Sequence, residues 1–269
     1  MKKIKNSRGE LTTQQIVLLI ILITSFSIIL FFFFKLNLGQ ETQKTICHNS
    51  VILKGKSIPS LGGGNLDCRT NYLCISGGED CEGINPTETI KVDSENKNEV
   101  LKSIANEMAD CWWMFGEGKV DYVGGINLID NNVCSICSIV AFDDEITQEK
   151  ISYEEFYEYL KNTKKDESNT YLSYLYNVFE LESFSEDYLK EELDFSKEYF
   201  VLTALGEKGA LISMKDFAFG SVDSFNDLFF GFWNLPNAAG DKEYSHVPIV
   251  LTEKSKLRDL GCDEFLTKA

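Results

Sequence analysis

Eight cysteines are the residues of this sequence whose chemistry depends most on spacing and on partners. They form two groups, four within residues 47–81 and four within residues 111–262. An even number of cysteines indicates a disulfide framework and an oxidising compartment. We expect up to four disulfides, paired inside each group, and we leave their connectivity open. The candidates are Cys47, Cys68, Cys74 and Cys81 in the first group and Cys111, Cys134, Cys137 and Cys262 in the second.

The segment Cys134-Ser-Ile-Cys137 has the C-x-x-C spacing of redox sites and of half a zinc site. A redox pair needs its first cysteine at a helix amino terminus, where the helix dipole lowers the thiol pKa. Here an apolar run that predicts a strand follows the motif. Zinc would need a second cysteine pair or paired histidines, whereas His48 and His246 are isolated in the sequence. The sequence favours structural disulfides over both alternatives.

The sequence nominates no catalytic, cofactor-binding or metal-binding residue. His246 lacks a nucleophile motif, so we interpret it as a structural or exposed histidine. The pair Trp112-Trp113 could form a sugar-stacking platform, but we favour Trp112 in the core and Trp113 at its rim.

An apolar run at residues 16–34 precedes all the cysteines. Its nineteen uncharged residues make about 28 Å of helix, close to the thickness of a bilayer's hydrocarbon core. Four basic residues precede the run, which predicts a cytoplasmic amino terminus and an extracytoplasmic remainder. A cleaved secretory signal is the weaker alternative. The predicted parts are a basic tail at 1–15, a transmembrane helix at 16–34, a polar stalk at 35–46, a Cys-rich cross-linked segment at 47–86 and an α+β domain at 87–269.

Charge limits the partners of the part beyond the anchor, which carries 22 basic and 41 acidic residues, a formal charge of −19. Nucleic acid is excluded as a partner on this ground. The lipid bilayer, through residues 16–34, and proteins at the cell surface are the partners that we expect.

Hydrophobic periodicity predicts an α+β fold with a small, mainly antiparallel sheet. For the helix at 95–115 we expect a cap at Asp93 or Ser94 and an end at Gly116. The other predicted helices cover 152–162, 170–179 and 255–260, and the predicted strands cover 133–142, 199–205, 210–214 and 247–251.

Residues 8–18, Arg-Gly-Glu-Leu-Thr-Thr-Gln-Gln-Ile-Val-Leu, resemble the archaeal class III signal of type IV pilin-like proteins. The resemblance implies cleavage after Gly9, so that the mature chain would begin at Glu10. Gly9 and Leu18 match the family pattern, whereas Glu10, Thr12 and Gln14 are similar without being identical. The text from the anchor through LDCRTNYLCISGG, EMADCWWMFGEGK and CSICSIVAFDDEI also resembles an uncharacterised group of archaeal single-pass membrane proteins, which implies no activity.

Three functions follow as hypotheses. The first is a membrane-anchored, extracytoplasmic binding or interaction protein of unknown ligand. The second is a minor pilin-like subunit processed after Gly9. The third is an extracytoplasmic thiol/disulfide or hydrolytic enzyme.

Overall fold

A computed structural model describes residues 13–35, 38–56, 66–78, 80–123, 132–146, 150–181, 184–207 and 244–267. The chain divides into two compact units, Met1–Thr42 and Gln43–Ala269, which are treated separately below. Gly9, Glu10 and the strand predicted at 210–214 lie outside the described residues.

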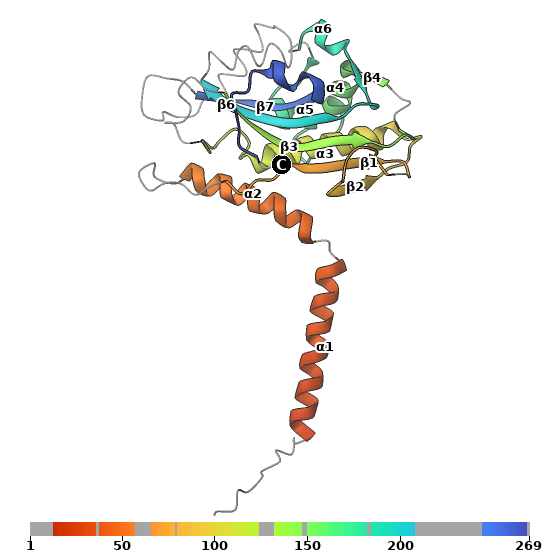
Figure 1. Cartoon of the computed structure of the whole chain (residues 1–269), viewed down its shortest axis with the longest axis vertical. Coiled ribbons are helices and arrows are strands. Elements are labelled where there is room, and N and C mark those ends of the chain that lie inside the picture. Colours follow the sequence, from red (N-terminus) through yellow and green to blue (C-terminus); the bar gives the residue numbers. More distant parts are fainter. Residues whose placement is uncertain are drawn as a thin grey trace, which may run out of the picture. The chain divides into compact units, whose positions relative to one another are not determined.

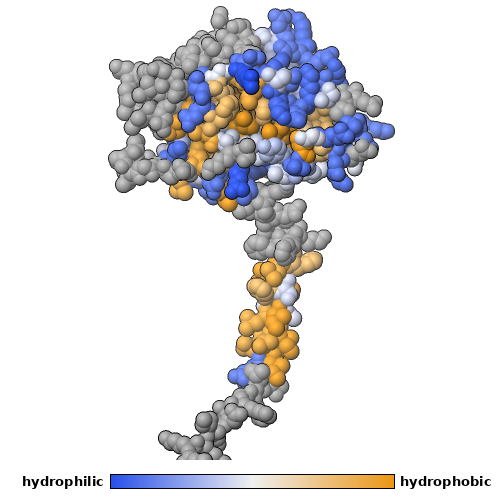
Figure 2. Space-filling view, viewed as in Figure 1, coloured by the Kyte–Doolittle hydropathy of each residue, from blue (hydrophilic) through white to orange (hydrophobic). Residues whose placement is uncertain are grey.

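The first unit contains α1, Thr13–Lys35, a helix long and apolar enough to cross a membrane. Its apolar stretch Gln14–Phe32 has a mean hydropathy of 2.7, and none of it is buried. The polar groups Thr24, Ser25 and Ser27 donate hydrogen bonds to backbone carbonyls one turn earlier, which removes unpaired donors from this surface. Figure 2 shows apolar side chains covering most of the described surface of α1.

The second unit is an α+β fold around one sheet (Figure 1). The sheet order is β2-β1-β3-β6-β7, and the short β8 pairs with β3 on the side that β1 occupies further along. Among the described strands, β2, β1, β3 and β8 pair in parallel, whereas β6 pairs antiparallel with both β3 and β7. The strands are β1 Asn71–Ser76, β2 Glu88–Lys91, β3 Val133–Phe142, β6 Tyr199–Glu207, β7 Tyr244–Glu253 and β8 Glu264–Phe265, with β4 Lys150–Ser152 and β5 Glu192–Asp194 in a separate antiparallel pair.

The α+β class is therefore confirmed, and the sheet is mixed where a mainly antiparallel one was predicted. Parallel pairing joins strands that are distant in sequence, so it leaves no hairpin signal to read. β1 comes from the segment predicted as a separate Cys-rich region, and it lies between β2 and β3 in the sheet.

Helix α3, Lys97–Met114, packs against β3, β6 and β7 with its apolar face. Its predicted cap is wrong: Asn96 occupies the N-cap position, and Asp93 instead takes a hydrogen bond from Glu95. The predicted end is confirmed, because Gly116 has a φ of +76°, a conformation that disfavours side chains.

The remaining helices pack around α3 and β7: α6 contacts α4, and η3 contacts β6 and β7. α5 contacts both α3 and β7, and α4 contacts α3 and α5. Ser152 caps α4 by accepting a hydrogen bond from the Glu155 amide, as its capping sequence predicts. These elements are α4 Tyr153–Asn162, α5 Tyr171–Tyr176, α6 Glu186–Leu189 and the 3₁₀ helix η3 Lys254–Leu260.

Four tyrosines explain how the sheet ends at β7, which pairs with β6 alone among the described strands. Tyr176 donates its hydroxyl to the carbonyl of Ile249 at 2.9 Å, and Tyr153 donates to that of Leu251 at 3.4 Å. The hydroxyl of Tyr157 lies 3.2 Å from those of Tyr176 and Tyr188. Buried carbonyls that an outer strand would have paired are thus satisfied by side chains.

Helix α2, Leu38–Lys56, replaces most of the predicted polar stalk. From Gln43 onward it belongs to the second unit. Its position is set by contacts with α3, described below.

Candidate functional site

The eight cysteines, all among the described residues, form four disulfides. The expectation of pairing inside each sequence group is confirmed. Cys262 ties the carboxyl-terminal segment to β3, as predicted. The pairs are Cys47–Cys68, Cys74–Cys81, Cys111–Cys137 and Cys134–Cys262.

The C-x-x-C motif lies within β3, and its two cysteines do not pair with each other. Cys134 and Cys137 are fully buried, and each is bonded to a cysteine outside the motif. A redox site requires a reactive thiolate that solvent can reach, whereas both cysteines of this motif are held in buried disulfides. The described residues also contain no cluster of side chains suited to a metal ion.

His246 is a buried residue of β7, as the structural interpretation required. Its Nε2 lies 3.1 Å from the carbonyl oxygen of Val120, so this nitrogen carries the proton that is donated. Nδ1 is buried without a hydrogen-bond partner among the described residues. Burial lowers the pKa of His246 to about 4, and the ring is neutral at neutral pH. Among the described residues, the ring thus hydrogen-bonds to one backbone carbonyl and to no acidic or hydroxyl side chain.

The tryptophan pair divides as predicted. Trp112 is buried in the core beside His246, with ring centroids 6.5 Å apart. Trp113 is partly buried and stacks on His48 of α2, with centroids 4.0 Å apart and planes 7° from parallel. Because His48 occupies this face of Trp113, that face cannot also stack on a sugar ring.

Three contacts hold α2 against α3. Lys44 lies 2.9 Å from Glu107 and 2.6 Å from Asp110. His48 Nδ1 donates to the carbonyl of Trp113 at 2.7 Å. Burial alone would lower the pKa of Lys44, but the two carboxylates outweigh it and raise that pKa, so the ammonium stays charged. The largely buried ammonium of Lys44 on α2 is thus paired with two carboxylates of α3.

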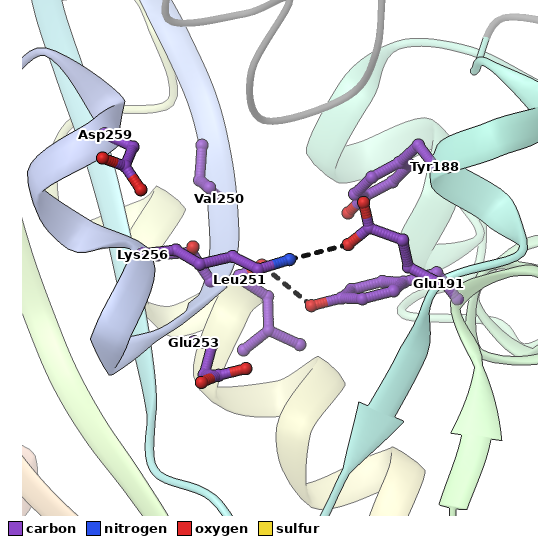
Figure 3. Close-up of a pocket in the computed structure, with 9 residues that line it drawn as sticks. Tyr188, Glu191, Val250, Leu251, Glu253, Lys256 and Asp259 are labelled. Carbon is purple, nitrogen blue, oxygen red and sulfur yellow. Dashed lines mark hydrogen bonds and ion pairs between the residues drawn. The ribbon is translucent and has the colours of Figure 1, made fainter.

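A surface cleft of about 150 Å³ lies between β7, η3 and the segment joining α6 to β5 (Figure 3). A cavity of this volume holds one group about the size of benzene. Its lining residues are Tyr153, Tyr188, Glu191, Val250, Leu251, Thr252, Glu253, Lys256 and Asp259.

Two tyrosine rings and an ion pair give the cleft its chemistry. The rings of Tyr153 and Tyr188 lie 4.8 Å apart, and burial raises both pKa values, so both phenols are neutral. Across the cleft Lys256 reaches Glu191 at 2.9 Å, as the dashed line in Figure 3 shows. Both partners are about half exposed, at 46% and 48%, which makes the pair weak and easily exchanged.

The other two carboxylates leave the cleft acidic. Glu253 is bound by Lys197 at 2.7 Å, and hydrogen bonds from Lys197 and Ser255 lower its pKa. Asp259 is exposed and has no ionic partner among the described residues. The lining contains neither cysteine nor histidine. This set of groups suits the binding of a positively charged group and includes no activated nucleophile.

Sequence reasoning did not find this cleft, because its residues come from four elements that share no local motif.

No family model, curated protein or solved structure matches the chain.

Proposed function

We propose that the chain is a membrane-anchored binding protein whose folded unit lies outside the cytoplasm. The observation that carries this proposal is α1, whose 23 residues make about 35 Å of helix. The apolar side chains of its Gln14–Phe32 stretch remain exposed. Such a surface is stable in lipid and costly in water.

Two features support the proposed orientation. Lys2, Lys3, Lys5 and Arg8 precede α1, and basic flanks favour the cytoplasmic side. Every cysteine follows α1 and is in a disulfide, and such bonds persist in oxidising compartments.

Protease treatment of intact cells tests this topology, with epitope tags at both ends of the chain. We expect the carboxyl-terminal tag to be digested, the amino-terminal tag to be protected, and the chain to resist extraction by alkaline carbonate. Release of the chain by carbonate, or the opposite pattern of protection, would overturn the proposal.

We further propose that the cleft binds a small organic cation. The three carboxylates of the cleft outnumber the two lysines that pair with them, Lys256 and Lys197, and the two tyrosine rings can add cation–π attraction to an ammonium group. The acidic charge of the whole domain increases the local concentration of cations. The cleft volume of about 150 Å³ can hold a whole tetramethylammonium ion, or one end of a benzyltrimethylammonium ion.

Titration calorimetry of the full chain in detergent with these two ammonium ions tests the site. Asp259→Asn removes a carboxylate and should weaken binding about fivefold, the size of one exposed ion pair. Lys256→Met removes the competing internal cation and should strengthen binding by a similar factor. Glu95→Gln, an exposed change before α3, is the matched control.

Opposite shifts for the two cleft variants cannot come from a general loss of folding. Equal affinities in all three variants, or no heat of binding in the unsubstituted chain, would contradict a cation site.

The pilin-like alternative rests on residues 8–18, of which the structure describes only 13–18, as the start of α1. Mass spectrometry of the native amino terminus separates it from the first proposal. A chain that begins at Glu10 supports processing and assembly, whereas an intact Met1 removes the alternative.

A further inference from the structure

Helix α2 has two faces with different roles. Its inner face follows a spacing of three and four residues and points into the second unit. Cys47 and Val51 on this face are buried, at 3% and 0% exposure. Gly55 continues the face, where a Cβ would lie 2.0 Å from a methyl carbon of Val120. The helix therefore packs too closely at that point for any side chain.

The inner face is fixed in rotation as well as in position. Lys44 is bound to Glu107 and Asp110, His48 is stacked on Trp113, and Cys47 is bonded to Cys68. Rotation of α2 about its axis would break the ion pairs of Lys44 and the stacking of His48 on Trp113.

The outer face carries two exposed apolar side chains. Ile46 and Leu53 are seven residues apart, so they lie two turns apart on one side of the helix, opposite Val51. Their exposed fractions are 36% and 71%. The last turn of α2 is basic, with Lys54 and Lys56.

We propose that this outer face of α2 lies on the lipid surface of the membrane. The inference rests on the proposed membrane anchoring by α1. Residues 36–37 alone separate the end of α1 from the start of α2, so Lys35 and Leu38 are three Cα steps apart, at most about 11 Å. The chain connection thus keeps the amino end of α2 within reach of the headgroups.

Charge selects lipid as the occupant. The part of the chain beyond the anchor has a formal charge of −19, so most of its surface is repelled by anionic headgroups. The last turn of α2 places Lys54 and Lys56 beside Leu53, and lysines next to an apolar side chain are attracted to anionic headgroups. A short apolar face is sufficient, because tethering raises its effective concentration at the bilayer to the order of millimolar.

Tryptophan fluorescence of the full chain in vesicles tests this contact. The variant Leu53→Trp places a fluorophore on the outer face, and Phe179→Trp places one at a side chain of matched exposure, 70%, beyond α5. The vesicles contain anionic phospholipid and lipids brominated near the headgroup, and the signal of the unsubstituted chain is subtracted.

We expect bromine to quench the added fluorescence of Leu53→Trp at least about twofold more than that of Phe179→Trp. Replacing both Lys54 and Lys56 by glutamate should reduce this quenching, whereas the same change at Lys190, an exposed helix-end lysine, should not. Equal quenching of the two tryptophan variants would overturn the inference.

Carbonate extraction of the same samples separates the two proposals. A chain that resists extraction while Leu53→Trp stays unquenched would refute the α2 contact and leave the anchor intact. A chain that is extracted would refute both. Intact disulfides in a non-reducing peptide map show that each variant is folded.

Discussion

Acidification should destabilise the second unit through His246. In the folded chain its Nε2 donates to the carbonyl of Val120, and Nδ1 is buried among Trp112, Tyr122 and the sheet with no acceptor nearby in the described residues. A proton added to Nδ1 would place an unpaired charge in the core. Burial accordingly lowers the pKa of His246 from 6.5 to about 4.

The size and sign of the effect follow from linkage. Between pH 6.5 and 4 the unfolded chain binds a proton on this ring that the folded chain does not bind. Stability is therefore fully present above pH 6.5 and is lost as the pH falls to 4. A shift of this size corresponds to about 3 kcal/mol, at about 1.4 kcal/mol for each pKa unit.

Denaturant unfolding of the full chain in detergent, followed by tryptophan fluorescence at several pH values, measures this loss. The matched variant is His246→Leu, which keeps a similar apolar volume and cannot titrate. We expect it to be less stable than the unsubstituted chain at pH 7.5 and to show about 3 kcal/mol less change between pH 7 and 4. Carboxylates titrate in both chains, so the difference between them isolates the histidine. Parallel pH profiles for the two chains would refute the reasoning.

Three other changes have outcomes set by the packing. Tyr176→Phe removes the hydroxyl that satisfies a buried β7 carbonyl and should lower the free energy of unfolding by about 1–3 kcal/mol in denaturant titrations. Lys44→Met leaves Glu107 buried without its cation and should expose the α2 backbone to hydrogen exchange, whereas adding Glu107→Met should restore most of the protection. Replacing Cys134 and Cys262 together by alanine should cost about 2–5 kcal/mol, because this bond closes the longest loop of the four.

The tyrosine and lysine changes each have a control in the same chain. Tyr174→Phe removes a hydroxyl that donates to Glu117 at a partly exposed site, so water can replace it at little cost. Lys197→Met breaks an exposed ion pair and should change stability by less than about 1 kcal/mol. Comparable losses in test and control variants would contradict the assigned roles of burial.

Local patterns predicted the elements whose periodicity is strong. The predicted strand 133–142 coincides with β3, and the predicted helix 95–115 contains α3 with two residues to spare at its start and one at its end. The capping sequence at Ser152 located α4 for the same reason, since a helix start depends on neighbours in sequence. These signals need no tertiary information.

The sequence failed where pairing is distant. β1 and β2 are short and lie near glycines. β1 pairs in parallel with β3, far along the chain, and β2 pairs in parallel with β1, so neither strand has a hairpin partner. Pro248 lies inside β7, which would ordinarily argue against a strand. The proline is tolerated because the β6–β7 register shifts at this point of β7, and because a tyrosine hydroxyl, that of Tyr176, pairs with the neighbouring carbonyl of Ile249.

The site was predictable in part for the same physical reasons. Grouping the cysteines by sequence distance succeeded for three disulfides that span 21, 7 and 26 residues, because short loops cost less entropy to close. That reason does not cover Cys134–Cys262, which spans 128 residues. The cleft could not be predicted, since Tyr188, Glu191 and Lys256 meet only after α6 and η3 have packed around β7.

Helix α2 shows why a polar segment next to an anchor need not be a flexible stalk. Its average hydropathy is near zero, and its order comes from one face that matches α3. The disulfide at Cys47 ties it to the chain before β1, while Lys44 and His48 tie it to α3, so it bridges two elements that are separate in sequence. The Lys44 and His48 contacts oppose rotation of α2 about its axis, and the disulfide and the buried Val51 hold the same face inward, so Leu53 faces outward. The apolar exposure of Leu53 is therefore a fixed property of the fold.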